Sequence, residues 1–356
     1  MVKKGSFPRE TVVGKAVRKG TALGLLALLV VFAGGCAKKE AKTLEAQKNA
    51  QGQDVYTIKT WSKLDCTGAP FFVGERKGFF EEEGIKVVYT GDTAVPQRVP
   101  SILHGDNDVG DAHPNEIALV REGGAAVRAI GLSIVEPPPE VTDIHLQHMW
   151  WVTGPNSDIK SPADINKHQG RVKIQMITRN ACMDFNTDVL LERYNIPREK
   201  LEYLTMPDIE GIQALKQGLI DIAIPHPPYF KSVEDFGGNV IATSRELRGA
   251  NAGTYLYYAA DDFIKKNPEA VRRFIRAIKK AERWANENPE QTAKWTEEAI
   301  GIPVLANHWY STTSEINDSF IQEWIDGAKA AGSLEPGAKV TVADIVTHEF
   351  DAAGRP

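Results

Sequence analysis

The sequence predicts an α/β fold in two lobes, each a mainly parallel sheet flanked by helices. Strand-like apolar runs alternate with helical periodicity across residues 55–260, with short polar loops between them. This alternation is typical of parallel sheets with right-handed crossovers. In addition, Asp108–Pro114 (Asp-Val-Gly-Asp-Ala-His-Pro) reappears as Asp221–Pro227 (Asp-Ile-Ala-Ile-Pro-His-Pro), with Gly105 and Gly218 in register. A duplicated strand-to-loop unit indicates two similar lobes that present the same loop to one cleft.

The N-terminus has the pattern of a secretory lipoprotein. Residues 1–35 begin with a basic region and continue with the apolar run Ala22–Ala33, which is too short to span about 30 Å of hydrocarbon as a helix. Small residues then lead into Cys36, in an order that resembles a bacterial lipobox. We therefore expect a signal peptide over 1–35, lipidation of Cys36, and a flexible, polar tether over 36–54.

Charge and cysteine content exclude several classes of protein. The formal net charge is −5, and the leader carries six basic groups and one acidic group, so the mature chain has −5 − 5, or about −10. This argues against nucleic-acid binding through bulk electrostatics. Apart from Cys36, only Cys66 and Cys182 remain, which form neither a disulfide framework nor a zinc site by spacing. We expect a monomer without a cofactor or resident metal.

We expect lobe 1 over residues 55–140 plus 255–356. Its first strand is predicted over Val55–Trp61 and its first helix over Ala69–Phe80. The chain is expected to return to lobe 1 at Tyr255–Ala260, and Asn267-Pro268 then opens an amphipathic helix. The apolar face of this helix is predicted to contain Val271, Phe274, Ile275, Ile278 and Trp284, and its solvent face Arg272, Arg273, Lys279 and Lys280.

Lobe 2 is expected over residues 141–254, after a hinge region at the three prolines 137–139. There the pattern restarts with a predicted strand at Val172–Gln175 and a predicted helix at Cys182–Tyr194, followed by the strand at Leu201–Thr205. The run His145–Thr153 is predicted to be a strand that crosses into lobe 2.

Four passages carry a resemblance to a known family. They are Gly68–Val87, Asp158–Ile165 with Val172-Lys-Ile, Asp221–Tyr229, and Asn267–Phe274 with Asn288-Pro-Glu. In this order they resemble the substrate-binding lipoproteins of ABC importers for aliphatic sulfonates, taurine, nitrate and thiamine precursors, over roughly residues 55–300. The resemblance implies a periplasmic-binding-protein type II fold with two hinge crossovers. It also implies a non-enzymatic receptor in the bacterial cell envelope, periplasmic or extracytoplasmic, that delivers a small molecule to an ABC permease and its ATPase.

Ligands of open α/β sheets bind beyond the carboxyl ends of the strands, and five predicted loops lie there. His113 and His226 take matched positions in the duplicated loops, and Arg179 precedes a helix N-terminus that favours an anion. The candidate ligand-binding residues are Trp61, Asp65, Cys66, Asp92, Asp111, His113, Asn115, Thr178, Arg179, Asn180, His226 and Tyr229.

The ligand itself stays open. A small organic acid such as a sulfonate or taurine ranks first, a heteroaromatic thiamine precursor second, and a metal or metal complex third. Sulfonate-binding members of the family have small hydroxyl residues where this chain has Asp111 and His113. This difference departs from a pocket that binds only anions. A sensor ectodomain is a further alternative. An enzyme ranks lower, because no motif places a base beside Cys66 or Cys182 and the cysteine-rich motif of the family's thiamine-pyrimidine synthases is absent.

Overall fold

The computed structural model describes residues 43–179 and 181–355. These belong to one compact unit, Lys39–Pro356, which is described here by itself. The expected signal peptide, Cys36 and Asn180 lie outside the described residues. Among the helices of the described chain, none combines the length and the apolar character that a membrane crossing requires.

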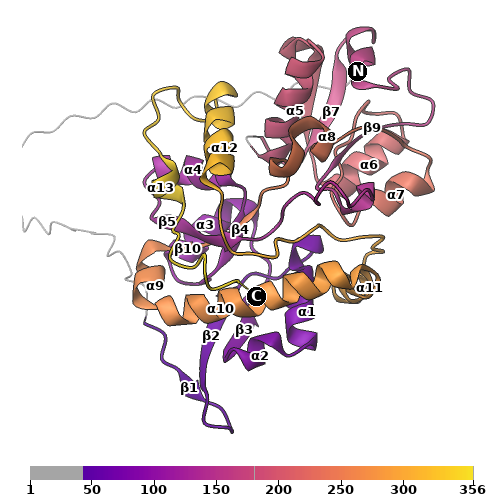
Figure 1. The fold of residues 1–356 in the computed structure, drawn as a ribbon. Helices are drawn as coiled ribbons and strands as arrows, with labels where there is room; N and C mark the ends of the chain where they lie inside the picture. The colour runs from indigo at the N-terminus through magenta and orange to yellow at the C-terminus, as the bar shows by residue number, and fades with distance from the viewer. Residues whose placement is uncertain (1–42, 180, 356) are drawn as a thin grey trace, which may run out of the picture. The chain divides into compact units, whose positions relative to one another are not determined.

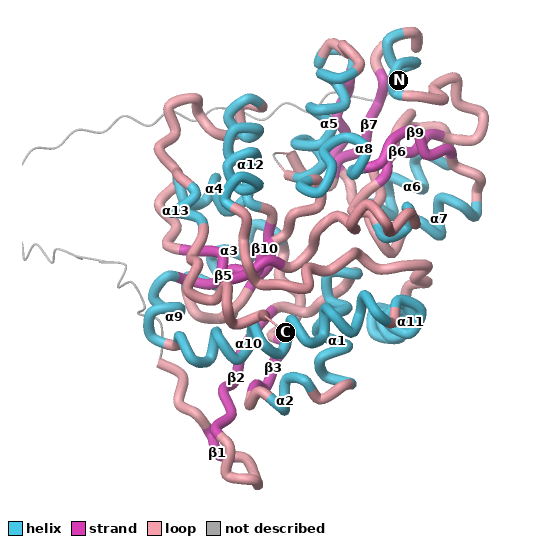
Figure 2. Tube along the Cα trace, viewed as in Figure 1, coloured by secondary structure: helices cyan, strands magenta, loops and turns pink. Residues whose placement is uncertain are grey.

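The first sheet is a composite of two three-stranded sheets with the strand orders β1-β2-β3 and β4-β10-β5, where β1 is Gln47–Lys48 (Figures 1 and 2). Strands β2 (Asp54–Thr60) and β3 (Ile85–Tyr89) are parallel, and β10 (Leu256–Ala260) lies between β4 (Gly110–Ala112) and β5 (Val127–Leu132), antiparallel to both. Backbone N–H groups of Asp108 and Val109 donate to the Lys59 carbonyl and so join β2 to the strand that contains β4. We call the half of the chain built on this sheet lobe 1.

The second sheet has an analogous order and defines lobe 2. Strands β7 (Val172–Met176) and β8 (Leu201–Thr205) are parallel, and β6 (Trp150–Thr153) pairs antiparallel with β9 (Asn239–Thr243). Residues 222–224 join the two pairs through a parallel bridge from Ile222 to β7 and an antiparallel bridge from Ala223 to β6. In each sheet the antiparallel strand, β10 or β6, is the one that enters from the other lobe, as expected for two hinge crossovers.

Helices cover both sheets, and Figure 1 shows α5–α8 gathered around the second sheet while α10 runs across β2 and β3. Lobe 1 contains α1 (Ala69–Arg76), α2 (Phe79–Glu82), α3 (Val95–Leu103), α4 (Pro114–Glu122), α9 (Asp261–Lys266), α10 (Pro268–Glu287), α11 (Pro289–Ile300), α12 (Asp318–Ala330) and α13 (Val342–Ile345). Lobe 2 contains α5 (Cys182–Arg193), α6 (Asp208–Lys216), α7 (Phe230–Asp235) and α8 (Ser244–Arg248). Short 3-10 turns lie at Cys66–Gly68, Ile144–Leu146, Pro162–Asn166, Arg198–Lys200 and Gly249–Asn251.

Helix α10 bears out its predicted apolar face but corrects one residue of its solvent face. Val271, Phe274, Ile275 and Ile278 are buried in the core of lobe 1. Lys279, expected in solvent, is fully buried and pairs with the equally buried Glu282 one turn on. The Lys279 ammonium also donates to the Leu132 and Ser311 carbonyls, and these extra partners explain how a buried charge is tolerated there.

The duplicated segments have the same structure in both lobes, which confirms the internal repeat. Asp108 accepts the Lys59 backbone N–H on its Oδ2 at 2.8 Å and donates its own N–H to the Lys59 carbonyl. Asp221 does the same with Lys173, at 2.7 Å. Each aspartate therefore ties the start of the repeated strand to the central strand of its sheet, which directs the following histidine loop to the sheet's carboxyl edge.

The expected tether differs from the structure at its C-terminal end. Gln47–Lys48 form strand β1, which pairs antiparallel with the start of β2. Asn49 closes the intervening turn, since its side-chain oxygen accepts the N–H groups of Gln51 and Gln53. The Leu44 N–H also donates to Asn267 Oδ1 at 2.7 Å. A hairpin held by side-chain hydrogen bonds carries no apolar periodicity, so hydrophobic pattern alone did not predict it.

Candidate functional site

The two lobes enclose a cavity of about 310 Å³ at the carboxyl edges of their sheets. Lobe 1 contributes His113 and Arg98 to its lining, and lobe 2 contributes Cys182 and His226. His148, just before β6, and His308, after α11, complete the polar wall. The cavity therefore lies where the sequence predicted a cleft and is bordered by both repeated loops.

Four histidines meet in this cavity. The His148 ring lies 5.1 Å from the His113 ring, 5.0 Å from the His226 ring and 5.1 Å from the His308 ring, measured between ring centres. His113, His148 and His308 are each about 95% buried. The two repeat histidines therefore face one site, as the duplication predicted, but they do so through His148, which the sequence analysis did not single out.

His113 is held by backbone groups at the start of α4. Its N–H donates to Glu116 Oε2 at 2.9 Å, and Pro114 opens the helix. Its ring Nδ1 lies 2.8 Å from the Thr254 carbonyl, which accepts a hydrogen bond from Nδ1, and the ring is also hydrogen-bonded to Cys182. Burial alone lowers the pKa of His113, but the neighbouring Cys182 thiol, Glu116 and this carbonyl outweigh burial and raise it.

His226 is held by a carboxylate instead. Asp208, the first residue of α6, accepts the His226 backbone N–H at 3.2 Å and its ring Nδ1–H at 2.9 Å. Although burial opposes it, Asp208 raises the pKa of His226 to about 10. The ring's Nε2 lies 3.6 Å from Cys182 Sγ.

Cys182 therefore has a base beside it, contrary to the inference from sequence motifs. It opens α5, and its thiol lies between the two repeat histidines. Burial raises the pKa of Cys182, but His113 and His226 outweigh burial and lower it to about 7. No spacing rule signals this arrangement, because Cys182, Asp208 and His226 belong to three different elements of lobe 2.

His148 is the least satisfied member of the cluster. Neither of its ring nitrogens has a hydrogen-bond partner among the described residues, and the same holds for Nδ1 of His308. Burial, and then the other histidines, lower the pKa of His148 well below its usual range. Gly253 packs directly against it, and a Cβ at that position would lie 2.9 Å from the His148 Cβ. Position 253 thus needs glycine for the ring to reach the cavity.

Arg98 on α3 is the cation of the cavity, and the sequence analysis missed it. Its guanidinium stacks on Trp61 at 5.1 Å, and Nε points to the Thr93 carbonyl at 3.5 Å. Within the described part of the chain, no carboxylate lies within ion-pair distance of it. Arg98 and Asp65 also border an adjoining hollow of about 370 Å³ that contains Trp61, Asp92 and Asp111.

The predicted site residues divide into three groups. Asp65, His113, Thr178, His226 and Tyr229 line the main cavity, and Trp61, Asp92 and Asp111 line the adjoining hollow. Asp111 is already paired with Lys63 at 2.9 Å, both fully enclosed. Cys66, Asn115 and Arg179 border neither space.

Arg179, the predicted anion clamp, pairs instead with Asp184 at 2.9 Å and stacks on Tyr203. Cys66 is fully buried near the Ala306 carbonyl, and burial raises its pKa well above the usual range. Asn115 is buried at the start of α4, behind the cavity wall. All three residues follow predicted strand ends, but none of them lines the cleft.

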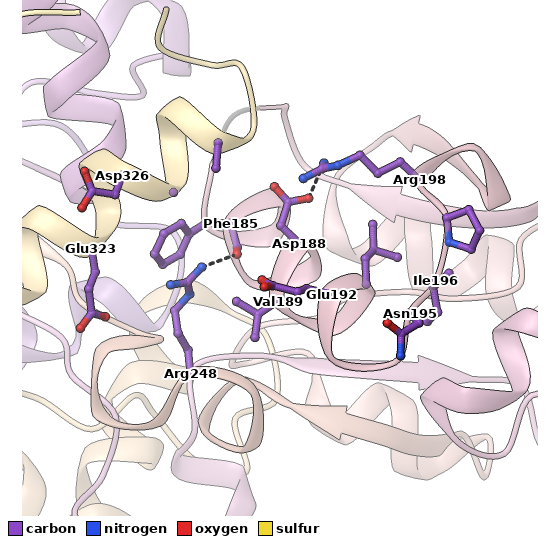
Figure 3. A pocket seen from close by; sticks show the side chains of 14 residues that line it. Phe185, Asp188, Val189, Glu192, Asn195, Ile196, Arg198, Arg248, Glu323 and Asp326 are labelled. Atoms are coloured by element: carbon purple, nitrogen blue, oxygen red, sulfur yellow. Dashed lines mark hydrogen bonds and ion pairs between the residues drawn. The ribbon is translucent and has the colours of Figure 1, made fainter. Parts of the chain in front are cut away.

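A larger hollow of about 820 Å³ lies between α5 and α12 (Figure 3). Its two arginines are already partnered: Arg198 pairs with Asp188 at 2.6 Å, and Arg248 stacks on Phe185 and donates to its carbonyl. It also lacks the histidine cluster. We therefore take the smaller, interlobe cavity as the functional site.

Two lobes, two crossovers and a ligand-sized cavity between them define a binding protein of the two-lobed periplasmic type. The chain belongs to the family described as NMT1/THI5 like, whose sequence model matches residues 67–292. It is also similar to the putative binding protein YtlA of Bacillus subtilis, with 23% identity over 222 residues. That match covers 61% of this chain and spans 62% of the length of YtlA.

Solved structures share the fold. The ligand-binding component of an ABC-type import system from Staphylococcus aureus, with zinc bound, matches with a TM-score of 0.68 at 13% identity, covering 84% of this chain and 99% of that one. The periplasmic aliphatic sulphonate binding protein SsuA from Escherichia coli matches with a TM-score of 0.66 at 15% identity, covering 82% and 92%. The predicted fold class is thereby confirmed.

Proposed function

We propose that the chain is the solute-binding protein of an ABC importer and captures a small organic acid in the interlobe cavity. The single observation that carries this is a cavity lined by both repeated loops, with Arg98 in its wall, a guanidinium that forms no ion pair with the described residues. A ligand that contacts both lobes stabilises the closed state and so reports its presence to a permease. SsuA, a sulfonate-binding protein of the same fold, supports this class of ligand.

The charges of the cavity favour a zwitterion. Arg98 supplies a fork of donors for a sulfonate or carboxylate, and Asp65 provides an acceptor for an ammonium group on the same side. A taurine-like amino sulfonate fits both. A purely anionic ligand would gain nothing from Asp65, which favours the zwitterion.

The test is Arg98→Gln, with taurine, an alkanesulfonate, nitrate and a pyrimidine titrated into parent and variant by calorimetry. Loss of a charge-assisted hydrogen bond costs about 1.5–3 kcal/mol, so we expect roughly 10–100-fold weaker binding of the preferred acid. Arg179→Gln is the matched control and should bind like the parent, because Arg179 is already paired with Asp184. Equal binding by the Arg98 variant, or weaker binding only by the Arg179 variant, would contradict the assignment.

The remaining assignments follow from the sequence. A cleaved signal and lipidation at Cys36 would hold the protein on the outer side of a membrane beside its permease and ATPase. Mass spectrometry of the purified N-terminus tests this, since lipidation adds acyl chains to Cys36 and Cys36→Ser abolishes them. A sensor ectodomain would bind the same solute, but permease and ATPase components would not co-purify with it.

A further inference from the structure

We propose that His113, His148, Cys182 and His226 form a transition-metal site in the interlobe cleft, which takes a divalent cation of the zinc type. This proposal extends the proposed function. It rests on that function in one respect, namely that the same cleft closes on its ligand. Lobe 1 supplies His113, lobe 2 supplies Cys182 and His226, and the segment before β6 supplies His148. The ion would therefore join the lobes directly.

The spacing of the donor atoms suits a tetrahedral ion. The ligand atoms of His113, His148 and Cys182 all lie within 4.8 Å of one another, and His226 Nε2 lies 3.6 Å from Cys182 Sγ. Zn–S and Zn–N bonds of about 2.3 and 2.0–2.1 Å place neighbouring donors about 3.4–3.6 Å apart in a tetrahedron. The Cys182–His226 edge already has this length, and no edge among His113, His148 and Cys182 exceeds 4.8 Å.

Outer partners orient the rings in the way metal ligands require. The Thr254 carbonyl holds the Nδ1–H of His113, and the Asp208 carboxylate holds the Nδ1–H of His226, so both Nε2 atoms point into the site. A carboxylate or carbonyl behind the histidine is the usual support for a metal-bound imidazole, and it raises the basicity of the ligand. The cluster therefore has supporting groups as well as donors.

A purely structural role for the cluster does not explain why His148 is buried without hydrogen-bond partners among the described residues. It is 4% exposed, and both its ring nitrogens lack a partner in the described chain although three other imidazoles lie about 5 Å away. A buried polar group without a partner costs about 1–3 kcal/mol. A metal ion bound to one nitrogen of His148 removes that cost for this nitrogen.

Charge and ligand type select the ion. Binding releases the Cys182 thiol proton and the His226 Nε2 proton to solvent, and the thiolate together with the Asp208 carboxylate then balances the two positive charges of the ion. Thiolate and imidazole donors favour zinc and its neighbours in the first transition series over magnesium and calcium, which prefer oxygen. The predicted order is therefore Zn²⁺ and Co²⁺ well above Mg²⁺ and Ca²⁺.

The test starts with the purified full chain stripped by a chelator. Co²⁺ is added and its absorption spectrum recorded, and Zn²⁺ affinity is then measured by competition with a chromogenic chelator. We expect one ion per chain, a sulfur-to-cobalt charge-transfer band, and displacement of Co²⁺ by Zn²⁺. Absence of stoichiometric binding, or a cobalt spectrum without the thiolate band, would overturn the proposal without any mutation.

Variants assign the ligands. Cys182→Ser should remove the charge-transfer band and, like His113→Ala and His148→Ala, weaken Zn²⁺ binding more than 100-fold, whereas Asp208→Asn should weaken it about 10–100-fold through His226. Cys66→Ser and His104→Ala are matched controls, since Cys66 is buried elsewhere and His104 is exposed at the end of α3. Circular dichroism checks that each variant folds. Unchanged affinity in Cys182→Ser and His148→Ala would refute the site.

Two further measurements separate this proposal from its rivals. Arg98→Gln should keep Zn²⁺ binding while losing the organic acid, so failure of one assignment is visible independently of the other. Alkylation of Cys182 by iodoacetamide should be slowed by Zn²⁺. Rapid alkylation that Zn²⁺ does not slow would contradict the metal site and favour a Cys182–His226–Asp208 nucleophile instead.

Discussion

The two copies of the histidine loop share one backbone design but differ in what holds the histidine. In lobe 1, Glu116 accepts the His113 backbone N–H and the neutral Thr254 carbonyl accepts its ring proton. In lobe 2, Asp208 alone accepts both groups of His226. The second histidine therefore lies against a buried negative charge and the first does not. A duplicated fold can thus place one residue type twice while the surrounding side chains give each copy a different charge.

Removing the two carboxylates is the strongest way to probe this difference. Asp208→Ala leaves a buried, charged His226 without its counter-ion, and breaking a buried pair costs about 3–5 kcal/mol. Glu116→Ala removes one hydrogen bond to a backbone N–H, so we expect about 1 kcal/mol. Urea unfolding curves measure both. Equal losses would mean that the Asp208–His226 pair is no stronger than the Glu116 contact.

The repeated aspartates give the next largest effect. Both accept a backbone N–H of the neighbouring strand, but Asp108 is 5% exposed whereas Asp221 is partly open to solvent. Water replaces a lost partner more easily at an open position. We expect Asp108→Ala to cost about 2–3 kcal/mol in the free energy of unfolding and Asp221→Ala about 1 kcal/mol. A reversed order would show that burial does not set the strength of this contact.

The pH dependence of Asp108 is a separate effect, and Asp108→Asn isolates it because asparagine keeps an acceptor for the Lys59 N–H. Burial raises the pKa of Asp108 from 3.8 to about 6, against the Lys59 contacts. The folded state therefore holds the proton more tightly than the unfolded state. The contribution of the Asp108 proton to the free energy of unfolding is complete below about pH 4 and is lost as the pH rises to about 6. The loss amounts to at most about 3 kcal/mol, and solvent screening makes it smaller. The Asn variant should lack this part of the slope, and identical profiles of the two proteins would refute the shift.

The same comparison shows why part of the fold was predictable. The Asp-to-His-Pro spacing is local, and the aspartate, strand and loop are consecutive in each lobe, so their repeat was visible in the chain and the structure reproduces it. The hairpin at Gln47–Lys48 and the burial of Lys279 were missed for a related reason. Hydrophobic periodicity reports neither side-chain-capped turns nor a charge that is buried with its partner.

By itself, the sequence determined the α/β class, the two-lobed arrangement and the place of the two histidine loops, because strand and helix periods and turn residues act over short distances. Only the tertiary structure decided which side chains share the cleft. Arg98, His148, Cys182, Asp208 and His308 lie on separate elements, far apart in the chain. Their meeting depends on how the two sheets face each other and on which way each side chain points. Neither property can be read from the spacing of residues in the sequence, which is why Arg179 was predicted to reach the cleft and Arg98 was not singled out.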